Sequence, residues 1–433
     1  MTSKSTHRQQ ALLSFPFFGL GLVALLALVA WAAIQPGLFS QPLVAPAVLA
    51  FVHLAVLGWL GPFVFGAAFQ LIPVLAEAPL WSRRLAWIHF VLHAVAAPLL
   101  IAALARADFA AAGIWGSVIA VGGLIFTLDL IVTADQRTRW SPENVGLILA
   151  LFWFAVTIVV GATLAFARAG RIAGIGIDPL RHLHLVCGLV GFFAGTLYAV
   201  SFKLVPMFLI GRAGSRFRQW SVLVLLHGGL FLLGPGLLGD HRPLRLLGAF
   251  AIAAATGAFV DEILGFYRGR FRPADAPLLT YFAGIAMLIP TTIVGVAALL
   301  RLDWWWLPPQ PGQSVFVLLI LGVLTPCILG MAGKIVPFLA WQWCYSAHIG
   351  RHRVPLVTDL FRAPLLRLQL AAILPALAAL VFGVWFDSSL ALRGAALGLL
   401  VAAATLALNI AGLLPHLLRP RLLPPATAPQ LKP

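Results

Sequence analysis

The stretch Tyr198-Ala-Val-Ser-Phe-Lys203-Leu-Val-Pro206-Met-Phe208 has two counterparts elsewhere in the chain. One is Phe65-Gly-Ala-Ala-Phe-Gln70-Leu-Ile-Pro73-Val-Leu75, and the other is Leu329-Gly-Met-Ala-Gly-Lys334-Ile-Val-Pro337-Phe-Leu339. All three share Gln or Lys, then two aliphatic residues, then Pro. The prolines stand 133 and 131 residues apart, so we predict three internal repeats. Their expected limits are about 11–135, 145–267 and 277–415.

The composition places these repeats in a membrane. Of the 433 residues, 61% are hydrophobic and 10% are charged, whereas about a quarter of a soluble domain is charged. A spanning helix needs about 20 mostly apolar residues, and we count twelve such segments, four in each repeat. We therefore predict an all-α polytopic protein in a single transmembrane domain, with three pseudo-threefold four-helix arcs. The expected spans are 11–34, 47–76, 85–105, 112–132, 145–167, 181–210, 219–239, 245–267, 277–300, 314–343, 366–386 and 391–415.

The net charge of +16 is interpreted as a topology signal and not as a nucleic-acid footprint. With the N-terminus inside, 19 of the 29 basic residues fall on the inner side, eight on the outer side and two within spans. Lys and Arg collect on cytoplasmic loops. We therefore expect a bacterial-type inner membrane protein with both termini in the cytoplasm. A four-span period does not fit the paired six-span halves of major-facilitator transporters.

Histidines near the outer ends of two spans are the first candidates for chemistry, because ionisable groups inside a bilayer are costly and usually functional. They are His53, His182 and His184, all expected at similar depth. Positions i and i+2 on a helix face about 200° apart, so His182 and His184 cannot face the same site. Cys187 shares the face of His184. The alternative is that these histidines are ordinary polar residues at the membrane edge.

Other polar residues within spans are weaker candidates. His89 and His93 share a helix face and could hold a metal, although snorkelling or helix packing also explains them. His227 lies in mid-span, where it could ligate, handle a proton or make an interhelical hydrogen bond. Lys203, Lys334 and Gln70 occupy equivalent repeat positions. They could form a polar cluster for haem propionates or protons, or could pair with carboxylates, for which the candidates are Glu77, Asp129, Asp261 and Glu262.

The twelve spans in three arcs, with histidines on spans 2 and 6, resemble the haem–copper oxidase subunit I superfamily. That superfamily includes the nitric oxide reductase large subunits and, more loosely, the NnrS-type haem- and copper-containing membrane proteins. The stretch from His53 through Gly58-Trp-Leu-Gly61 to Pro73 looks like the helix that carries a low-spin haem ligand there. The stretch from His182 through Gly188 to Phe208 looks like a version found in small relatives.

Departures from this family pattern limit what the resemblance implies. Oxidases carry a His-His pair after helix 7, where this chain has only His227, and His-x-His on helix 10, where residues 314–343 contain no histidine. The resemblance therefore implies a degenerate member without a complete oxygen-reducing centre. Its simplest surviving site is one haem b held by His53 and a histidine of span 6. Copper near His184 and Cys187 is a second option.

The resemblance leads us to expect a haem-binding membrane protein in electron transfer or in the response to nitrogen oxides or oxygen. Whether it is an enzyme stays open. Alternatives are a transporter, a metal- or haem-handling factor on the same scaffold, or a structural subunit without a cofactor. The expected partners are the lipid bilayer and a periplasmic redox protein, with a homo-oligomer as an open option and no nucleic acid.

Overall fold

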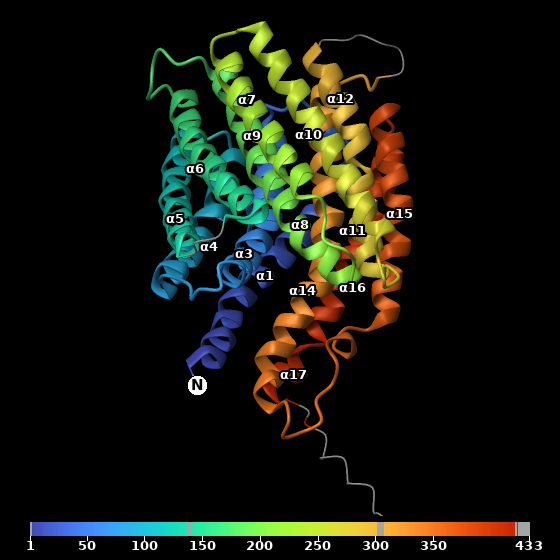
Figure 1. Ribbon diagram of the computed structural model, residues 1–433. Coiled ribbons are helices and arrows are strands. Elements are labelled where there is room, and N and C mark those ends of the chain that lie inside the picture. The colour runs from blue at the N-terminus through green and yellow to red at the C-terminus, as the bar shows by residue number, and fades with distance from the viewer. Residues whose placement is uncertain (1, 137–139, 301–306, 421, 423–433) are drawn as a thin grey trace, which may run out of the picture.

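The computed structural model describes residues 2–136, 140–300, 307–420 and 422, and this part of the chain forms a helical bundle without β-strands (Figure 1). Within it, twelve helical spans are long and apolar enough to cross a membrane. The predicted all-α, multi-pass membrane protein is thereby confirmed, with span limits within a few residues of those expected. The spans are Leu12–Ile34, Pro46–Leu75, Arg83–Ala105, Phe109–Asp135, Pro142–Arg168, Ile177–Leu209, Arg216–Leu238, Arg242–Arg268, Ala276–Leu300, Pro311–His348, Ala363–Trp385 and Ser389–Leu418.

The second, sixth and tenth spans each contain a π-helical segment between two α-helices. The second consists of α2 (Pro46–His53), the π segment Leu54–Leu60 and α3 (Gly61–Leu75). The sixth consists of α7 (Ile177–Val186), Cys187–Ala194 and α8 (Gly195–Leu209). The tenth consists of α13 (Pro311–Val317), Leu318–Leu324 and α14 (Thr325–Tyr345). Each π segment begins nineteen residues before the proline of the repeated stretch, so the helix irregularity has the same spacing as the sequence repeat.

The other spans are regular helices, except that the ninth is interrupted at Met287. Six α-helices begin at a Ser or Asp side chain that accepts an amide hydrogen, as N-caps do; these are Ser82, Asp108, Ser141, Ser215, Asp275 and Ser388. The remaining helices are α1 (Thr2–Ile34), α4 (Arg83–Ala105), α5 (Phe109–Asp135), α6 (Pro142–Arg168), α9 (Arg216–Leu238), α10 (Arg242–Arg268), α11 (Ala276–Ala286), α12 (Leu288–Leu300), α15 (Ala363–Trp385), α16 (Ser389–Ala411) and α17 (Leu414–Leu418), with short 3₁₀ turns at Pro36–Ser40, Ser346–His348 and Val357–Asp359.

The second span has a proline two residues after its π segment, where the sixth span has Thr196. The amide of Gly61 donates to the carbonyl of Val56, five residues back, as in a π-helix. In the same pattern the carbonyl of Leu57 would need the amide of residue 62, but Pro62 has no N–H. The tenth span repeats this arrangement, since the amide of Thr325 donates to Ile320 and residue 326 is again proline.

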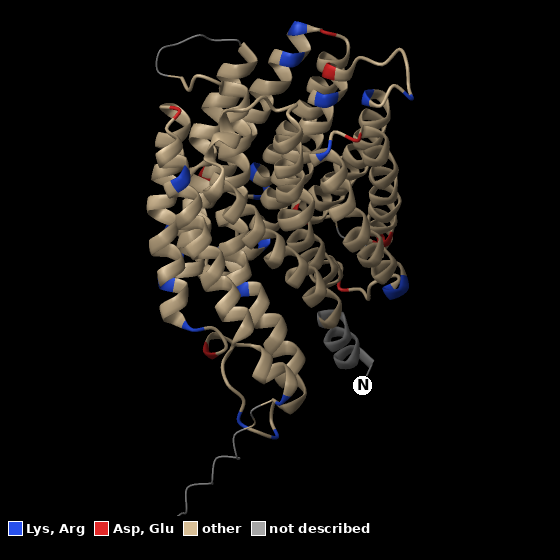
Figure 2. Cartoon of the chain, turned by 180° about the vertical axis from the view of Figure 1, so that it is seen from behind, with Lys and Arg blue, Asp and Glu red and all other residues tan. Residues whose placement is uncertain are grey.

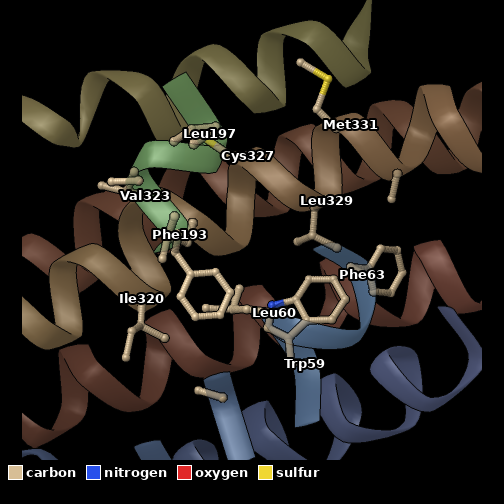
Figure 3. Close-up of a cluster of buried hydrophobic side chains, with 14 of the residues drawn as sticks. Trp59, Leu60, Phe63, Phe193, Leu197, Ile320, Val323, Cys327, Leu329 and Met331 are labelled. Carbon is tan, nitrogen blue, oxygen red and sulfur yellow. The ribbon is translucent and has the colours of Figure 1, made fainter. Parts of the chain in front are cut away.

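The π segments lie together in the core. Those of the second and sixth spans both contact that of the tenth, and side chains from all three spans form one buried cluster (Figure 3). Trp59 from the second span donates its indole N–H to the hydroxyl of Thr325, at 3.2 Å. Because an indole N–H is usually paired when it is buried, this bond fixes the second span against the tenth.

A glycine recurs at the fifth position of each π segment, as Gly58, Gly191 and Gly322. A Cβ atom at any of these glycines would lie within 3.0 Å of a side chain on the first span of the same predicted repeat, namely Ala24, Trp153 or Met287. The glycines therefore allow the second span of each repeat to approach the first closely.

Charged residues lie mainly toward the two ends of the bundle (Figure 2). α17 lies at the end of the bundle where α1 begins (Figure 1). The opposite end, where α6 ends and α7 begins, is called the α6–α7 end below. A cavity opens near it.

Candidate functional site

One cavity extends from the α6–α7 end between the second and sixth spans, with α4, α5 and α6 forming its other walls. The centres of water-sized spheres can occupy about 160 Å³ of this cavity. The whole empty space between its walls, which includes solvent at the open mouth, is about 1380 Å³. The walls are mostly apolar, and the only charged or imidazole side chains that line them are His53, His184, Arg168 and Arg181.

His53 of α2 and His184 of α7 come together in this cavity from opposite walls. Their ring centroids lie 6.3 Å apart, and the ring planes differ by only 14°. Each histidine lies about seven residues inside the first residue of its helix. At 1.5 Å per residue, this puts both at the same depth, roughly 10 Å below the helix starts.

Both imidazoles are oriented by backbone carbonyls. Nδ1 of His53 lies 2.7 Å from the carbonyl of Leu49, and Nδ1 of His184 lies 2.9 Å from the carbonyl of Thr157. A carbonyl oxygen only accepts, so each Nδ1 carries the proton. In the neutral ring, Nε2 then keeps its lone pair. Metal-ligating histidines almost always donate their other ring N–H in this way.

Gly161 of α6 makes room for the His184 ring. A Cβ atom at position 161 would lie 2.7 Å from Cε1 of His184, closer than real contacts allow, and 3.1 Å from its Nδ1. The absence of a side chain therefore permits His184 to reach the Thr157 carbonyl. Sequence reasoning missed Gly161, because nothing in the local sequence links it to a histidine 23 residues later.

The neighbours of His184 in sequence lie elsewhere. His182 is exposed and does not line the cavity, as expected for residues two apart on a helix. Cys187 is buried, with 1% of its surface exposed, and does not line the cavity either. Within the described ranges, no group of three or more His, Cys, Asp or Glu side chains could hold a metal ion.

His227 of α9 is held by a tryptophan of α6. The indole N–H of Trp153 donates to Nδ1 of His227 at 3.0 Å. An indole nitrogen only donates, so the proton of His227 is on Nε2, which is buried and has no partner among the described residues. His227 does not line the cavity. Its ring lone pair accepts the hydrogen bond that joins α9 to α6.

His93 of α4 completes the hydrogen bonding of the second span. Its Nε2 lies 2.8 Å from the carbonyl of Leu57. The α-type donor for that carbonyl, the Gly61 amide, bonds to Val56 instead, and the π-type donor is missing because residue 62 is proline. His89, one turn away, points its Nδ1 at the carbonyl of Gly122, 2.9 Å away. Its ring packs among Phe17, Phe65 and Phe126. The pair therefore joins helices, and neither histidine lines the cavity.

We expect His93→Phe to lower the stability of the protein by about 1–3 kcal/mol, because the Leu57 carbonyl would be buried without a donor. Thermal unfolding in detergent would measure the loss, with the exposed His182→Ala as the control. His93→Gln, which keeps a donor, should recover part of it. An unchanged melting temperature for His93→Phe would contradict this role.

The polar residues of the repeated stretch do not share one environment. Lys334 forms an ion pair with Asp275 and lies 5.6 Å from the ring of Phe208. Lys203 is exposed, whereas Gln70 is buried with its side-chain nitrogen unpaired among the described residues. Asp275, the N-cap of α11, was not among the predicted partners. Of those, Asp261 and Glu262 pair with Arg218, and Asp129 accepts from the Ser82 amide.

Comparison of the chain with known protein families and with characterised proteins finds no match. The class of the protein is therefore defined by its own architecture, as a multi-pass helical membrane protein with a histidine-containing cavity between its second and sixth spans.

Proposed function

We propose that this chain is a haem-binding integral membrane protein in which His53 and His184 hold one haem b as axial ligands. The arrangement of these two imidazoles carries the proposal. Their rings are nearly parallel, 6.3 Å apart between centroids, and both have Nδ1 bonded to a backbone carbonyl. An iron with two axial nitrogens needs these nitrogens about 4 Å apart, at about 2 Å per bond. With the two nitrogens facing each other across such an iron, each ring centroid would lie behind its nitrogen, and the observed 6.3 Å between centroids is compatible with that arrangement.

The lining of the cavity also suits a ligand that is largely apolar. Phe154 and Phe192 line its deep part, and small residues such as Gly116 and Ala162 line its side. A copper site near His184 lacks this support, since Cys187 does not line the cavity.

We propose electron transfer as the role of this site. A bound haem b would supply one-electron transfer, and both His53 and His184 would hold its iron. His53 and His184 then leave no position for oxygen or nitric oxide. The chain would act in respiratory or nitrogen-oxide metabolism without a complete oxygen-reducing centre, accepting or passing on electrons with a periplasmic redox protein.

The proposed family relationship, a degenerate member of the haem–copper oxidase subunit I superfamily or a relative of the NnrS type, gains support from the repeat. Three π segments, three glycines and three prolines keep one register, which favours three four-span arcs. The distribution of basic residues favours termini in the cytoplasm and a cavity that opens to the periplasm.

The test is the spectrum of the full chain purified in mild detergent. We expect a Soret band, a six-coordinate low-spin haem and a rhombic ferric EPR signal from near-parallel imidazoles. The reduced protein should not bind carbon monoxide. A protein without haem would support the alternative of a cofactor-free structural subunit. A high-spin haem that binds carbon monoxide would overturn the paired ligation.

A further inference from the structure

Two arginines stand in the otherwise apolar wall of the cavity. Arg168 is the last residue of α6, and Arg181 lies in the first turns of α7. Arginine is strongly disfavoured in an apolar membrane environment unless it faces a polar partner or an aqueous cavity. A cavity lined by apolar residues and two arginines therefore fits a ligand that is apolar for most of its length and anionic at one edge.

The positions of the two arginines relative to the histidines are fixed by helix geometry. Arg181 precedes His184 by three residues, so it lies on the same face, one turn nearer the α6–α7 end. Arg168 follows Gly161 by seven residues, which again gives the same face, two turns nearer that end. Both guanidinium groups thus lie between the paired imidazoles and the mouth, on two different walls.

The contacts that these two arginines already make leave several guanidinium N–H donors without an acceptor among the described residues. Arg181 forms one ion pair with Asp178, at 2.9 Å, and the Asp178 side chain is 71% exposed. Arg168 lies over the ring of Phe109, 4.5 Å from its centroid, and no carboxylate of the described residues pairs with it. A guanidinium has five N–H donors and suits the planar geometry of a carboxylate.

We propose that Arg168 and Arg181 bind two carboxylates at the mouth of the cavity, and that these are the two propionates of the haem held by His53 and His184. This inference rests on the proposed function and deepens it by orienting the cofactor. The propionate edge faces the α6–α7 end, and the apolar edge faces Phe154 and Phe192. Lys203 and Lys334, which the sequence had suggested for propionates, do not line this cavity.

The test compares haem with its dimethyl ester, in which both carboxylates are blocked. Full-length protein prepared without haem is titrated with each compound in detergent. The variants are Arg168→Gln, Arg181→Gln and the double substitution, and the control is the exposed Arg171→Gln. We expect the wild type and the control to bind haem at least about tenfold more tightly than the ester, a difference of about 1.4 kcal/mol. The double variant should bind both compounds equally while its spectrum stays low-spin.

A second measurement separates a clamp from a structural role. Positive charge beside the cofactor disfavours the oxidised form, which carries one more positive charge than the reduced form. Removing both arginine charges should therefore lower the midpoint potential of the double variant. Arg168→Lys, which keeps the charge, should keep most of the potential.

Each remaining outcome has a definite meaning. If the wild type binds haem and ester equally, the carboxylate clamp is wrong and the proposed function stands. If neither compound gives a bis-histidine spectrum with the wild type, the proposed function itself fails. If the substitutions alter binding to phosphatidylglycerol vesicles but not the preference for haem, the arginines bind lipid headgroups, and the inference is overturned.

Discussion

His184→Gly protein should retain less than about a tenth of the haem found in the wild type, and added imidazole should restore the low-spin spectrum. Removing only the partner behind a metal-ligating histidine costs roughly 10–100-fold in affinity, so removing the ligand itself should cost at least as much. The loss follows from the site, where His184 faces His53 across 6.3 Å. The measurement is haem content per protein after purification, followed by titration with imidazole.

Matched substitutions make this result specific. His53→Gly should behave as His184→Gly does, because both imidazoles hold the same iron in the proposed site. His182→Ala changes an exposed residue on the same helix and should leave haem content unchanged. His227→Ala should also keep the haem, since His227 bonds to Trp153 outside the cavity. Full haem content in both His53→Gly and His184→Gly would rule out the proposed ligands.

The twelve spans were predictable because the bilayer demands long apolar segments, and the sequence shows them directly. The second span was expected at 47–76 and lies at Pro46–Leu75. Its π segment was not predicted. Pro62, which removes one amide from this span, is visible in the sequence, but a proline within an apolar helix more often indicates a simple kink. Only the bond from Gly61 to Val56 identifies the π geometry.

The candidate site was predictable only in part. Equal depth on two spans singled out His53 together with a histidine of span 6, and helix periodicity required His182 and His184 to face apart. Gly161 and the two arginines could not be found this way, because their relation to His184 arises from helix packing. Arg168 and Arg181 were counted only as a topology signal. The carbonyl partner of His93 and the indole partner of His227 likewise depend on tertiary contacts.

Gly161→Val should abolish haem binding while leaving the bundle folded. Even a Cβ atom at position 161 would lie 2.7 Å from Cε1 of His184, and the two methyl groups of valine would extend into the cavity that both residues line. The imidazole would have to leave the carbonyl of Thr157. Small-to-large changes in a packed site typically cost about 1–3 kcal/mol, and a displaced ligand adds to that loss.

The graded series Gly161→Ala and Gly161→Val distinguishes displacement of His184 from general destabilisation. Alanine should weaken haem binding and shift the spectrum, and valine should eliminate the low-spin form. Gly228→Ala is the matched control, because a Cβ atom there meets nothing within 4 Å and alanine favours the helix. Thermal unfolding of the haem-free proteins should show that the Gly161 variants still unfold cooperatively, with a loss of stability no larger than the packing cost of about 1–3 kcal/mol. If Gly161→Val binds haem with an unchanged low-spin spectrum, His184 does not occupy the position that makes it a ligand, and the paired-imidazole site has to be abandoned.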